Sequence, residues 1–479
     1  MSLRRLANHA DVMRAYSRVH FIGIGGAGMS GIAEVLATLG YQVSGSDLGE
    51  SGVTRRLASL GVTVQRGHSA DHVDGADVVV VSSAIQSDNV ELLAARSQHI
   101  PVVARAEMLG ELMRFRLGIA VAGTHGKTTT TSLIASVLAE GGLDPTFVIG
   151  GQLLSAGTSA RLGAGRYLVA EADESDGSFL RLSPLLAVIT NIDADHLDNY
   201  GGEFARVREA FADFLHRLPF YGLAVLCTDD PEVAALAAQT PRHLMTYGVG
   251  PDADVRASGI VAAGERMRFN LHLPQTETVF EVSLALPGHH NVLNALAAAA
   301  IGWQLGVEPQ AIARALKQFG GVGRRFNLHG EIRVHGGHAL LVDDYGHHPR
   351  ELAAVFEAVR SGWPERRLVV AFQPHRYSRT RDLLDDFAEV LATVDVLVLS
   401  DVYAAGESPI ASADSKALAR AIRARGRVEP VLVGAATDLP AALAPLMHDG
   451  DFLLFAGAGD IGHVAQDLAA LRALPGVAA

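Results

Sequence analysis

Short apolar runs alternate with longer amphipathic stretches along most of the chain. The first apolar run, 19–24, is followed by a helical pattern that extends to about residue 39. Further apolar runs cover 41–45, which leads to Asp47, and 78–81. Such alternation of strand and helix patterns is typical of a parallel sheet with helices on its faces.

The same pattern recurs in two later segments, so the chain is predicted to form three α/β domains. In the second segment it predicts strands at 167–170, 186–190 and 223–227, edge hairpins within 252–286, and a helix at 291–305. In the third it predicts strands at 339–342, 367–371, 396–399 and 452–455. The stretch 105–116 is interpreted as a connector. We place the domains at 1–107, 108–325 and 326–479.

Composition narrows the class of protein. A length of 479 residues fits about three domains. The net charge of −12, without a long basic run, predicts no nucleic-acid partner. No apolar run is long enough for a membrane span. The single cysteine, Cys227, excludes an intrachain disulfide, and the N-terminus has no apolar signal region, so we expect a cytoplasmic protein.

The most informative stretch follows a predicted strand that ends near residue 122. Residues 123–129 read GTHGKTT and open a helix. The backbone N–H groups of a glycine loop and the helix N-terminus behind it can bind phosphate oxygens. A lysine at this place reaches the outer phosphates, and the Thr128 hydroxyl can hold Mg²⁺. The loop is shorter than the standard pattern, because Val121 stands where that pattern has its first glycine.

Lysine usage supports a phosphate-binding role for this loop. The chain contains only three lysines, Lys127, Lys317 and Lys416, and every other basic residue is arginine. A compact ammonium group fits between phosphates where a planar guanidinium does not. We therefore interpret Lys127 as a phosphate ligand; the alternative is a lysine that only tops a surface helix.

A second glycine loop follows the first predicted strand. Gly23, Gly25 and Gly28 match the dinucleotide-binding fingerprint, and Asp47 stands about 20 residues further on, where a ribose-binding acid belongs. A diphosphate cradle with such a carboxylate suits NAD or a nucleotide sugar equally. The structural alternative is that the glycines only permit a tight turn.

Polar clusters follow several other predicted strands. Residues 171–176 read EADESD and residues 191–198 read NIDADHLD. Carboxylates at strand ends beside a phosphate loop commonly bind Mg²⁺, and His196 is a candidate ligand for a second divalent ion. The pattern does not resemble a zinc site, because no cysteine pair or HExxH motif accompanies it.

The third segment carries its own clusters, DDYGHHP at 343–349 and QPHRYSRT at 373–380, after predicted strands. Such positions form the crevice of an open α/β sheet, and Arg376 and Arg379 can grip a carboxylate or phosphate there. Asn291 and Asn294 begin the Ala-rich helix, where they are interpreted as helix caps or as contacts to a base edge.

Taken in order, these motifs resemble those of the Mur ligase family. The matching stretches span nearly the full chain: HFIGIGGAGMSGIAEVL, AGTHGKTTTT, EADESDGSFL, TNIDADHLDNY, HHNVLNALAA, GRRF, DDYGHHP and QPHRYSRTRDL. The resemblance implies a Rossmann-like N-terminal domain that binds a UDP-sugar. It also implies a central P-loop ATPase-like parallel-sheet domain that binds ATP, and a Rossmann-like C-terminal domain that brings the amino acid.

Within the family, the motifs resemble the branch that joins L-alanine to UDP-N-acetylmuramate. This resemblance implies a ligase that uses ATP and Mg²⁺, with Mn²⁺ as a substitute metal. The lactyl carboxylate becomes an acyl phosphate before the alanine amine attacks it. The implied partners are the small molecules UDP-N-acetylmuramate, L-alanine and ATP. The implied setting is cytoplasmic peptidoglycan precursor synthesis by a monomer or homodimer.

The resemblance also assigns roles to single residues. The catalytic set is Lys127, Glu171, His196, Arg325, His347, Arg376 and Arg379. The ATP contacts are Gly123, Thr124, His125, Gly126, Lys127, Thr128, Thr129, Asn291, Asn294, Arg325 and Asp344. The substrate contacts are Gly25, Gly26, Ala27, Gly28, Asp47, His68, Ser82, Ser83, Tyr345, His347, Arg376 and Arg379. The metal ligands are Thr128, Glu171 and His196.

One device of the wider family is absent, and three alternatives remain open. Residues 197–227 contain no lysine, so the carbamoylated lysine of several Mur ligases is missing. The alternatives are a recycling ligase that adds a preformed tripeptide, an NAD-dependent oxidoreductase, and a non-catalytic nucleotide sensor. Because the assigned groups come from all three segments, ligand-driven domain closure is also expected.

Overall fold

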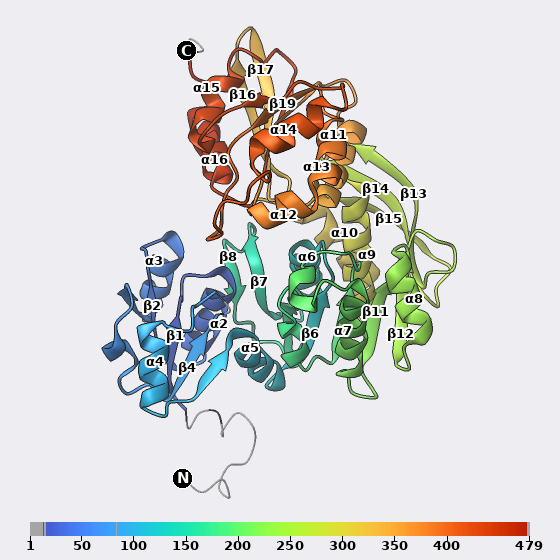
Figure 1. The fold of residues 1–479 in the computed structure, drawn as a ribbon. Coiled ribbons are helices and arrows are strands. Elements are labelled where there is room, and N and C mark those ends of the chain that lie inside the picture. Colours follow the sequence, from blue (N-terminus) through green and yellow to red (C-terminus); the bar gives the residue numbers. More distant parts are fainter. Residues whose placement is uncertain (1–12, 14–15, 83, 477–479) are drawn as a thin grey trace, which may run out of the picture. The chain divides into compact units, whose positions relative to one another are not determined.

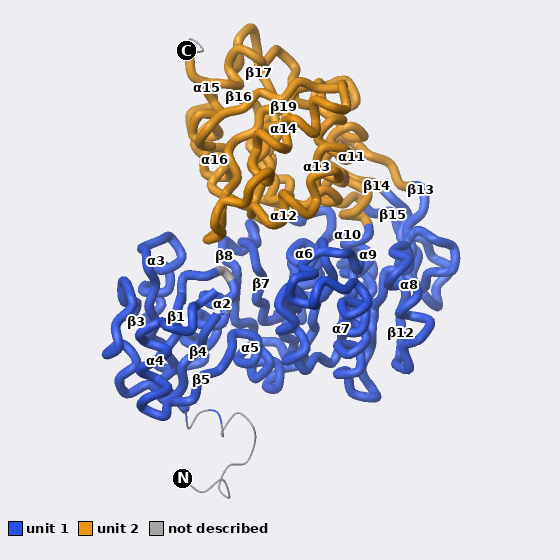
Figure 2. Tube along the Cα trace, in the orientation of Figure 1, with its two compact units in different colours: residues 1–259, 269–282, 293–319 blue, residues 260–268, 283–292, 320–479 orange. Residues whose placement is uncertain are grey.

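The computed structural model describes residues 13, 16–82 and 84–476, whose strands form three sheets connected by helices (Figure 1). Close contacts divide the chain into two compact units (Figure 2). Unit 1 comprises 1–259, 269–282 and 293–319, and unit 2 comprises 260–268, 283–292 and 320–479. The predicted class is confirmed: the chain is α/β, it matches the models of three Mur ligase domains, and each sheet has a parallel core. The exact domain boundaries stay a prediction.

The first sheet is parallel, with strand order β3-β2-β1-β4-β5. Its elements are β1 (Arg18–Ile22), α2 (Ala27–Thr38), β2 (Gln42–Asp47), α3 (Gly52–Ser59), β3 (Thr63–Arg66), η2 (Ala70–Val73), β4 (Val78–Val81), α4 (Val90–Ser97), β5 (Val102–Ala104) and α5 (Arg105–Arg114). The strand order reverses beside β1, so the glycine loop after β1 lies at the switch point where such sheets bind ligands.

The first predicted strand is two residues too long at its C-terminal end. β1 ends at Ile22, because Gly23 has φ +78° and turns the chain toward α2. The backbone N–H groups of Gly23 and Ile24 both donate to the carbonyl of Ser46, each at 2.9 Å. The apolar Ile24 belongs to the core rather than to the strand.

The second sheet has the order β15-β14-β13-β12-β11-β10-β6-β9-β7-β8. Its strands are β6 (Leu117–Ala122), β7 (Thr146–Leu153), β8 (Thr158–Arg161), β9 (Tyr167–Glu171), β10 (Leu186–Ile189), β11 (Leu223–Cys227), β12 (His243–Gly248), β13 (Val255–Ala263), β14 (Arg266–His272) and β15 (Val279–Leu284). The accompanying helices are α6 (Lys127–Glu140), η3 (Ser178–Arg181), η4 (Leu197–Tyr200), α7 (Phe204–His216), α8 (Pro231–Gln239), α9 (His289–Gln304) and α10 (Pro309–Gln318). The alternating stretch 252–286 supplies the three edge strands, as predicted.

Within unit 1, the helix α2 of the first sheet packs directly against β7 and β8 of the second. A Cβ atom at Gly31 would lie 3.1 Å from both Val148 Cγ1 and Ala160 Cβ, so glycine permits this close approach. The stretch 105–116, interpreted as a connector, is largely the helix α5, whose buried Leu109 and Leu112 belong to the same core.

The third sheet is mixed, with order β16-β17-β21-β18-β19-β20 and one antiparallel pair, β16 with β17. Its strands are β16 (Asn327–Val334), β17 (Gly337–Asp344), β18 (Leu368–Phe372), β19 (Val396–Leu399), β20 (Val431–Leu432) and β21 (Phe452–Ala456). The helices are α11 (Pro349–Gly362), α12 (Tyr377–Asp382), α13 (Leu384–Leu391), α14 (Ser415–Arg423), η5 (Ala436–Asp438), α15 (Leu439–Leu443) and α16 (Ile461–Leu471). No described helix is both long and apolar enough to cross a membrane.

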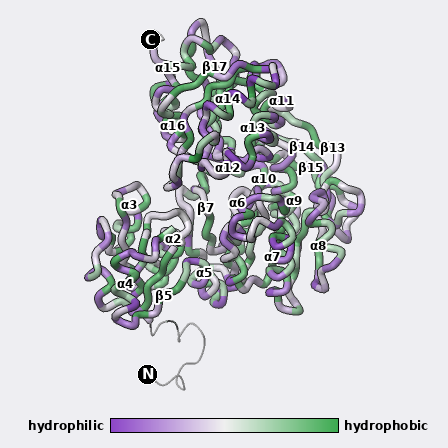
Figure 3. Tube along the Cα trace, viewed as in Figure 1, coloured by the Kyte–Doolittle hydropathy of each residue, from purple (hydrophilic) through white to green (hydrophobic). Residues whose placement is uncertain are grey.

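Helix α7 illustrates how amphipathic patterning fixes the packing of unit 1. Its residues Phe211 and Phe214 are fully buried, while the opposite face is polar (Figure 3). Their rings lie 5.3 and 5.0 Å from the ring of Phe179, between centroids. Offset and edge-to-face aromatic pairs of this kind add to the burial of apolar surface.

We expect Phe211→Ala to destabilise unit 1 by about 3–5 kcal/mol, because it removes a buried ring and leaves a cavity. Urea denaturation followed by circular dichroism measures this change. The matched control is Phe220→Ala, since Phe220 is 82% exposed in the loop before β11 and its loss should cost less than about 0.5 kcal/mol. Equal effects of the two variants would contradict this account of the core.

Candidate active site

The phosphate loop joins β6 to α6, between the ends of β9 and β10. Two of its residues have to be glycine. Gly123 has φ +130° and Gly126 has φ +83°, both in the region that side chains disfavour. A Cβ atom at Gly126 would also lie 2.7 Å from Asn294 Oδ1. The loop, with its backbone N–H groups and the N-terminus of α6 behind it, therefore has the strand–loop–helix context that a phosphate site requires.

Lys127 lies folded over this loop. Its Nζ donates hydrogen bonds to the carbonyls of Gly123 (2.7 Å) and Thr124 (3.0 Å) and to Glu174 Oε1 (2.9 Å). Burial lowers the pKa of Lys127, but the charges of Glu174 and Asp173 outweigh burial and raise it overall. The lysine is therefore a permanent cation at the loop, held by groups that a bound phosphate can replace.

Glu174 is the partner that sequence reasoning did not single out. Its side chain is almost completely buried, and burial raises its pKa to about 7 despite the nearby Lys127 charge. The Tyr200 hydroxyl donates to its backbone carbonyl at 2.5 Å. The acidic cluster at 171–176 includes Glu174, but the sequence does not distinguish it from its acidic neighbours. In the structure Glu171 has a different partner, because its Oε1 accepts from the N–H of Gly150 at 2.6 Å.

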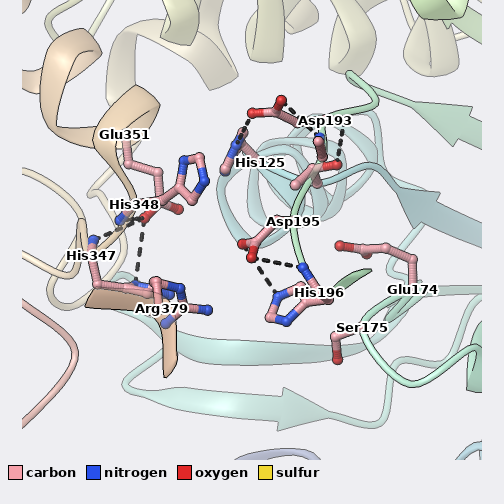
Figure 4. Close-up of polar contacts among 12 residues, drawn as sticks. His125, Glu174, Ser175, Asp193, Asp195, His196, His347, His348, Glu351 and Arg379 are labelled. Atoms are coloured by element: carbon pink, nitrogen blue, oxygen red, sulfur yellow. Dashed lines mark hydrogen bonds and ion pairs between the residues drawn. The ribbon is translucent and has the colours of Figure 1, made fainter. Parts of the chain in front are cut away.

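The segment after β10 clamps the phosphate loop from the other side. Asn191 Oδ1 accepts from the N–H of His125 (2.8 Å), and Thr190 Oγ1 donates to the His125 carbonyl (2.6 Å). His125 Nε2 lies 3.2 Å from Asp193 Oδ2 (Figure 4). The sequence pointed to this stretch but not to the clamping roles of Thr190 and Asn191.

His196 lies in the same segment with φ +56°, an uncommon value outside glycine. Its N–H donates to Asp195 Oδ1 at 2.8 Å, and its Nε2 lies 3.5 Å from Asp195 Oδ2 (Figure 4). The predicted metal ligands Thr128 and Glu171 supply hydroxyl and carboxylate oxygens, the hard donors that Mg²⁺ prefers. The imidazole of His196 is a softer donor, so the oxygen pair fits Mg²⁺ better than the histidine does.

Asn294 and Asn291 lie on α9 but in different units. Asn294 Oδ1 accepts from the Thr130 hydroxyl on α6 at 3.0 Å, which ties α9 to the phosphate-loop helix within unit 1. In unit 2, Asn291 Nδ2 donates to the carbonyl of Pro287 at 2.7 Å. Their adenine contact stays a prediction.

The first glycine loop is shaped by Asp47. Asp47 Oδ2 accepts from the N–H of Gly25 at 2.8 Å, and a Cβ atom at Gly25 would lie equally close to that oxygen. Beside Gly28 lies the guanidinium of Arg105, a cation that sequence reasoning missed because it sits at the start of α5. Gly26 precedes α2 and Ala27 begins it.

The remaining predicted residues of the first domain follow strands of the same sheet. His68 follows β3, and its Nδ1 lies 3.0 Å from Ser46 Oγ on β2. Ser82 Oγ accepts from the N–H of Ala84 at 3.2 Å. Ser83 lies outside the described residues.

In unit 2, Asp344 closes the turn after β17. Its two carboxylate oxygens accept from the N–H groups of Phe326 (2.7 Å) and Gly346 (2.6 Å). Burial raises the pKa of Asp344 to about 6, against the opposing charge of Arg325. The Arg325 guanidinium lies over the Tyr345 ring, 4.9 Å from its centroid. Arg325 and Tyr345, which were also predicted as ligand contacts, therefore lie next to Asp344.

A group of rings follows β17 and β18 in unit 2. His347 Nδ1 lies 2.9 Å from the Tyr345 carbonyl, which can only accept, so Nδ1 carries the proton. Burial lowers the pKa of His347 to about 4, and the imidazole is therefore neutral at pH 7 with a free lone pair on Nε2. The backbone N–H of His347 donates to Glu351 Oε2 at 2.9 Å, and Figure 4 shows both residues.

Four further residues complete this group. Arg376 and Arg379 were predicted from the sequence, whereas the rings of His375 and Tyr403 were not. His375 stacks on Tyr403 at 5.5 Å between ring centroids, and burial lowers its pKa to about 3. Arg379 is buried, and its Nη1 lies 3.5 Å from His375 Nδ1. Arg376 has φ +70° and donates its N–H to the Tyr403 carbonyl. The structure thus brings Tyr345, His347 and Arg379 into one cluster, and their contact with the substrate stays a prediction.

Comparison with known proteins decides the family. Models of the Mur ligase family match residues 18–116 (catalytic domain), 121–302 (middle domain) and 324–459 (glutamate ligase domain). The chain belongs to the Mur ligase family. A UDP-N-acetylmuramate–L-alanine ligase of Xanthomonas campestris pv. campestris (strain B100) is 69% identical over 467 residues, covering 97% of this chain and 98% of the relative.

Other similar proteins also belong to this family of ligases. A UDP-N-acetylmuramate–L-alanine ligase of Stenotrophomonas maltophilia (strain K279a) is 70% identical, covering 98% of both chains. The solved UDP-N-acetylmuramate–alanine ligase of Thermotoga maritima has a TM-score of 0.80 at 30% identity, covering 95% of this chain and 98% of that one. A murein peptide ligase of Psychrobacter arcticus has a TM-score of 0.71 at 24% identity, covering 97% and 100%, and shows the fold alone.

The neutral His347 predicts a pH effect on stability. Its pKa of about 4 lies below the value of about 6.5 expected of an unfolded histidine. The stability that neutral His347 contributes is therefore fully present above about pH 6.5 and is lost as the pH falls toward 4. We expect His347→Asn, which keeps a donor for the Tyr345 carbonyl but does not titrate, to lose less unfolding free energy between about pH 7.5 and 5.

Urea denaturation at the two pH values measures this difference. The variant His335→Asn, at an exposed position in the turn between β16 and β17, is the control and should lose as much as the unmodified protein. The burial of His347 would not matter if His347→Asn lost stability on acidification as steeply as His335→Asn.

Proposed function

We propose that the protein is an ATP-dependent ligase that joins L-alanine to UDP-N-acetylmuramate in cytoplasmic peptidoglycan precursor synthesis. One observation carries this proposal. The chain is 69–70% identical, over nearly its whole length, to ligases named for this reaction. The phosphate loop with Lys127, the strand-end carboxylates and the glycine loop of the first sheet supply the groups that such a reaction needs.

The chemistry has to overcome an inert carboxylate. The lactyl carboxylate of the sugar nucleotide does not react with an amine at neutral pH. Transfer of the γ-phosphoryl group of ATP to this carboxylate releases ADP and forms an acyl phosphate. The alanine amine then forms the C–N bond, the bond from the carbonyl carbon to the phosphate oxygen breaks, and phosphate leaves.

The residues of unit 1 stabilise the charge that moves during phosphoryl transfer. Lys127 exchanges its contacts with Glu174 and the loop carbonyls for the outer phosphates of ATP, and the loop N–H groups add further donors. Thr128 and Glu171 would hold Mg²⁺, which would supply a positive charge between the phosphates and the carboxylate and so lower their repulsion. His196 orients the segment after β10 or adds a ligand for a second ion.

The residues of unit 2 suit a small amino acid. The neutral imidazole of His347 offers its Nε2 lone pair to the amine, and the Arg376 and Arg379 guanidiniums match a carboxylate. Asp344 and Arg325 are assigned to the ribose and phosphates of ATP.

The reaction is tested by measuring phosphate release with each component omitted in turn. We expect release only when ATP, Mg²⁺, UDP-N-acetylmuramate and L-alanine are all present. With ¹⁸O in the lactyl carboxylate, one labelled oxygen should appear in the released phosphate. The recycling alternative predicts instead a preference for the preformed tripeptide. Release that is indifferent to the sugar nucleotide would refute the proposal, and binding without release would favour a nucleotide sensor.

Lys127→Ala should lower kcat by at least about a hundredfold, because one charged donor to the transferred phosphoryl group is lost. Lys127→Arg should fare little better, since the planar guanidinium does not fit the loop. The other two lysines, Lys317 and Lys416, are exposed, and Lys317→Ala and Lys416→Ala are matched controls with unchanged kcat. Normal turnover of a folded Lys127→Ala protein would remove Lys127 from the mechanism.

A further inference from the structure

A buried carboxylate in the first domain is surrounded by three histidines. Glu91, in the first turn of α4, has no exposed surface. Its Oε1 lies 2.6 Å from His72 Nδ1, and its Oε2 lies 3.4 Å from His68 Nδ1 and 3.6 Å from His20 Nε2. The Ser46 hydroxyl donates to Oε2 at 2.5 Å. Burying a carboxylate this completely is costly unless its charge has a use or a partner.

The hydrogen bonds fix which atoms carry protons. Burial opposes ionisation of Glu91, but the nearby His20 and the hydrogen bonds with Ser46 and His72 outweigh it and lower the Glu91 pKa to about 2, so this carboxylate can only accept. Ser46 has one proton and gives it to Glu91. The contact of 3.0 Å between Ser46 Oγ and His68 Nδ1 is therefore donated by His68. A relay runs from His68 Nδ1–H to Ser46 Oγ–H to Glu91.

The same relay is tied to the first glycine loop. The carbonyl of Ser46 accepts from the N–H groups of Gly23 and Ile24, while the carbonyl of Asp47 accepts from the N–H of Gly67 at 2.7 Å. Residues 46 and 47 of β2 thus bind the glycine loop on one side and the turn that carries His68 on the other. His68 keeps part of its surface exposed, with 17% of its side chain accessible.

We propose that Glu91 is a positioning residue for the substrate: through Ser46 it fixes His68 with Nδ1 turned inward and supplies the counter-charge that makes Nε2 a hydrogen-bond donor to the diphosphate of the UDP-sugar. A diphosphate only accepts hydrogen bonds, so Nε2 of His68 needs a proton to contact it. Because Nδ1 already donates to Ser46, an imidazole that makes both contacts carries a proton on both nitrogens. The other titratable groups near Glu91 are His20, His72 and Asp71. This inference rests on the proposed binding of a UDP-sugar to the first domain.

The test measures the dissociation constants of UDP and of uridine for the full-length protein and for Glu91→Gln. Glutamine keeps the size of the side chain and removes the charge. We expect UDP to bind about tenfold more weakly to Glu91→Gln, because a charge-assisted contact is lost, and uridine to bind within about twofold of the unmodified protein. A merely structural role of Glu91 would weaken both ligands alike, and that result would overturn the proposal.

A second variant and a control guard against misfolding. Ser46→Ala breaks the relay but leaves the bond between His72 and Glu91, and it should reproduce the selective loss of UDP affinity. Glu34→Gln removes another buried carboxylate of this domain, one bonded to Arg56 at 2.7 Å, and should leave both ligands unaffected.

The protonation itself has a spectroscopic signature. With ¹⁵N-labelled histidine rings, His68 in the UDP complex should show protons on both nitrogens, and in Glu91→Gln on one only; an unchanged His68 spectrum would refute the proposal. If the unmodified protein bound uridine and UDP equally, the diphosphate would contribute nothing to binding, and the proposed contact with His68 would be refuted. If it bound neither, the UDP-sugar site of the proposed function would fail first.

Discussion

The parallel pairing of β6 with both β9 and β10 is the constraint on which the nucleotide site depends. Val121 pairs with Glu171 and Ala122 pairs with Ile189, so three chain segments far apart in sequence end at the same edge of one sheet. The phosphate loop is then confined between an acidic turn and the Thr190–Asn191 segment. Glycine is needed at 123 and 126 because the neighbouring backbone and side chains leave no room for a Cβ atom.

The strands that end at this edge and the polar residues that follow them were predictable from the sequence. Which of these side chains contact one another was not. Short apolar strands such as β4, β11 and β19 have the limits that the pattern predicted, because buried parallel strands are continuous apolar runs. Lys127 stood out by its place in the glycine loop and by the scarcity of lysine in the chain. The ion partner Glu174 did not, because burial, which separates it from its acidic neighbours, is a property of the fold.

The same limit applies to the other residues that the sequence missed. Arg105 lies beside Gly28 only because α5 packs against the first sheet, and the stretch that contains it was interpreted as a connector. His375 and Tyr403 belong to turns after different strands and meet in space. Asp47 was predicted as a ligand contact, yet in the structure its carboxylate also holds the glycine loop in shape. A polar side chain near a turn can stabilise the turn itself, and the sequence does not distinguish this role from ligand binding.

The contact at Gly31 gives the first two domains a common interior. Because α2 packs so tightly on β7 and β8 that even a methyl group at position 31 would require its neighbours to shift, and because one apolar core includes residues of both domains, neither half retains a complete apolar interior when the chain is cut between them. The described residues of 320–479 belong to the other compact unit and contribute nothing to this shared core, so changes of sequence there leave it intact. A bulkier residue at position 31 would press on Val148 of β7 and Ala160 of β8, and the two domains would have to shift apart to admit it.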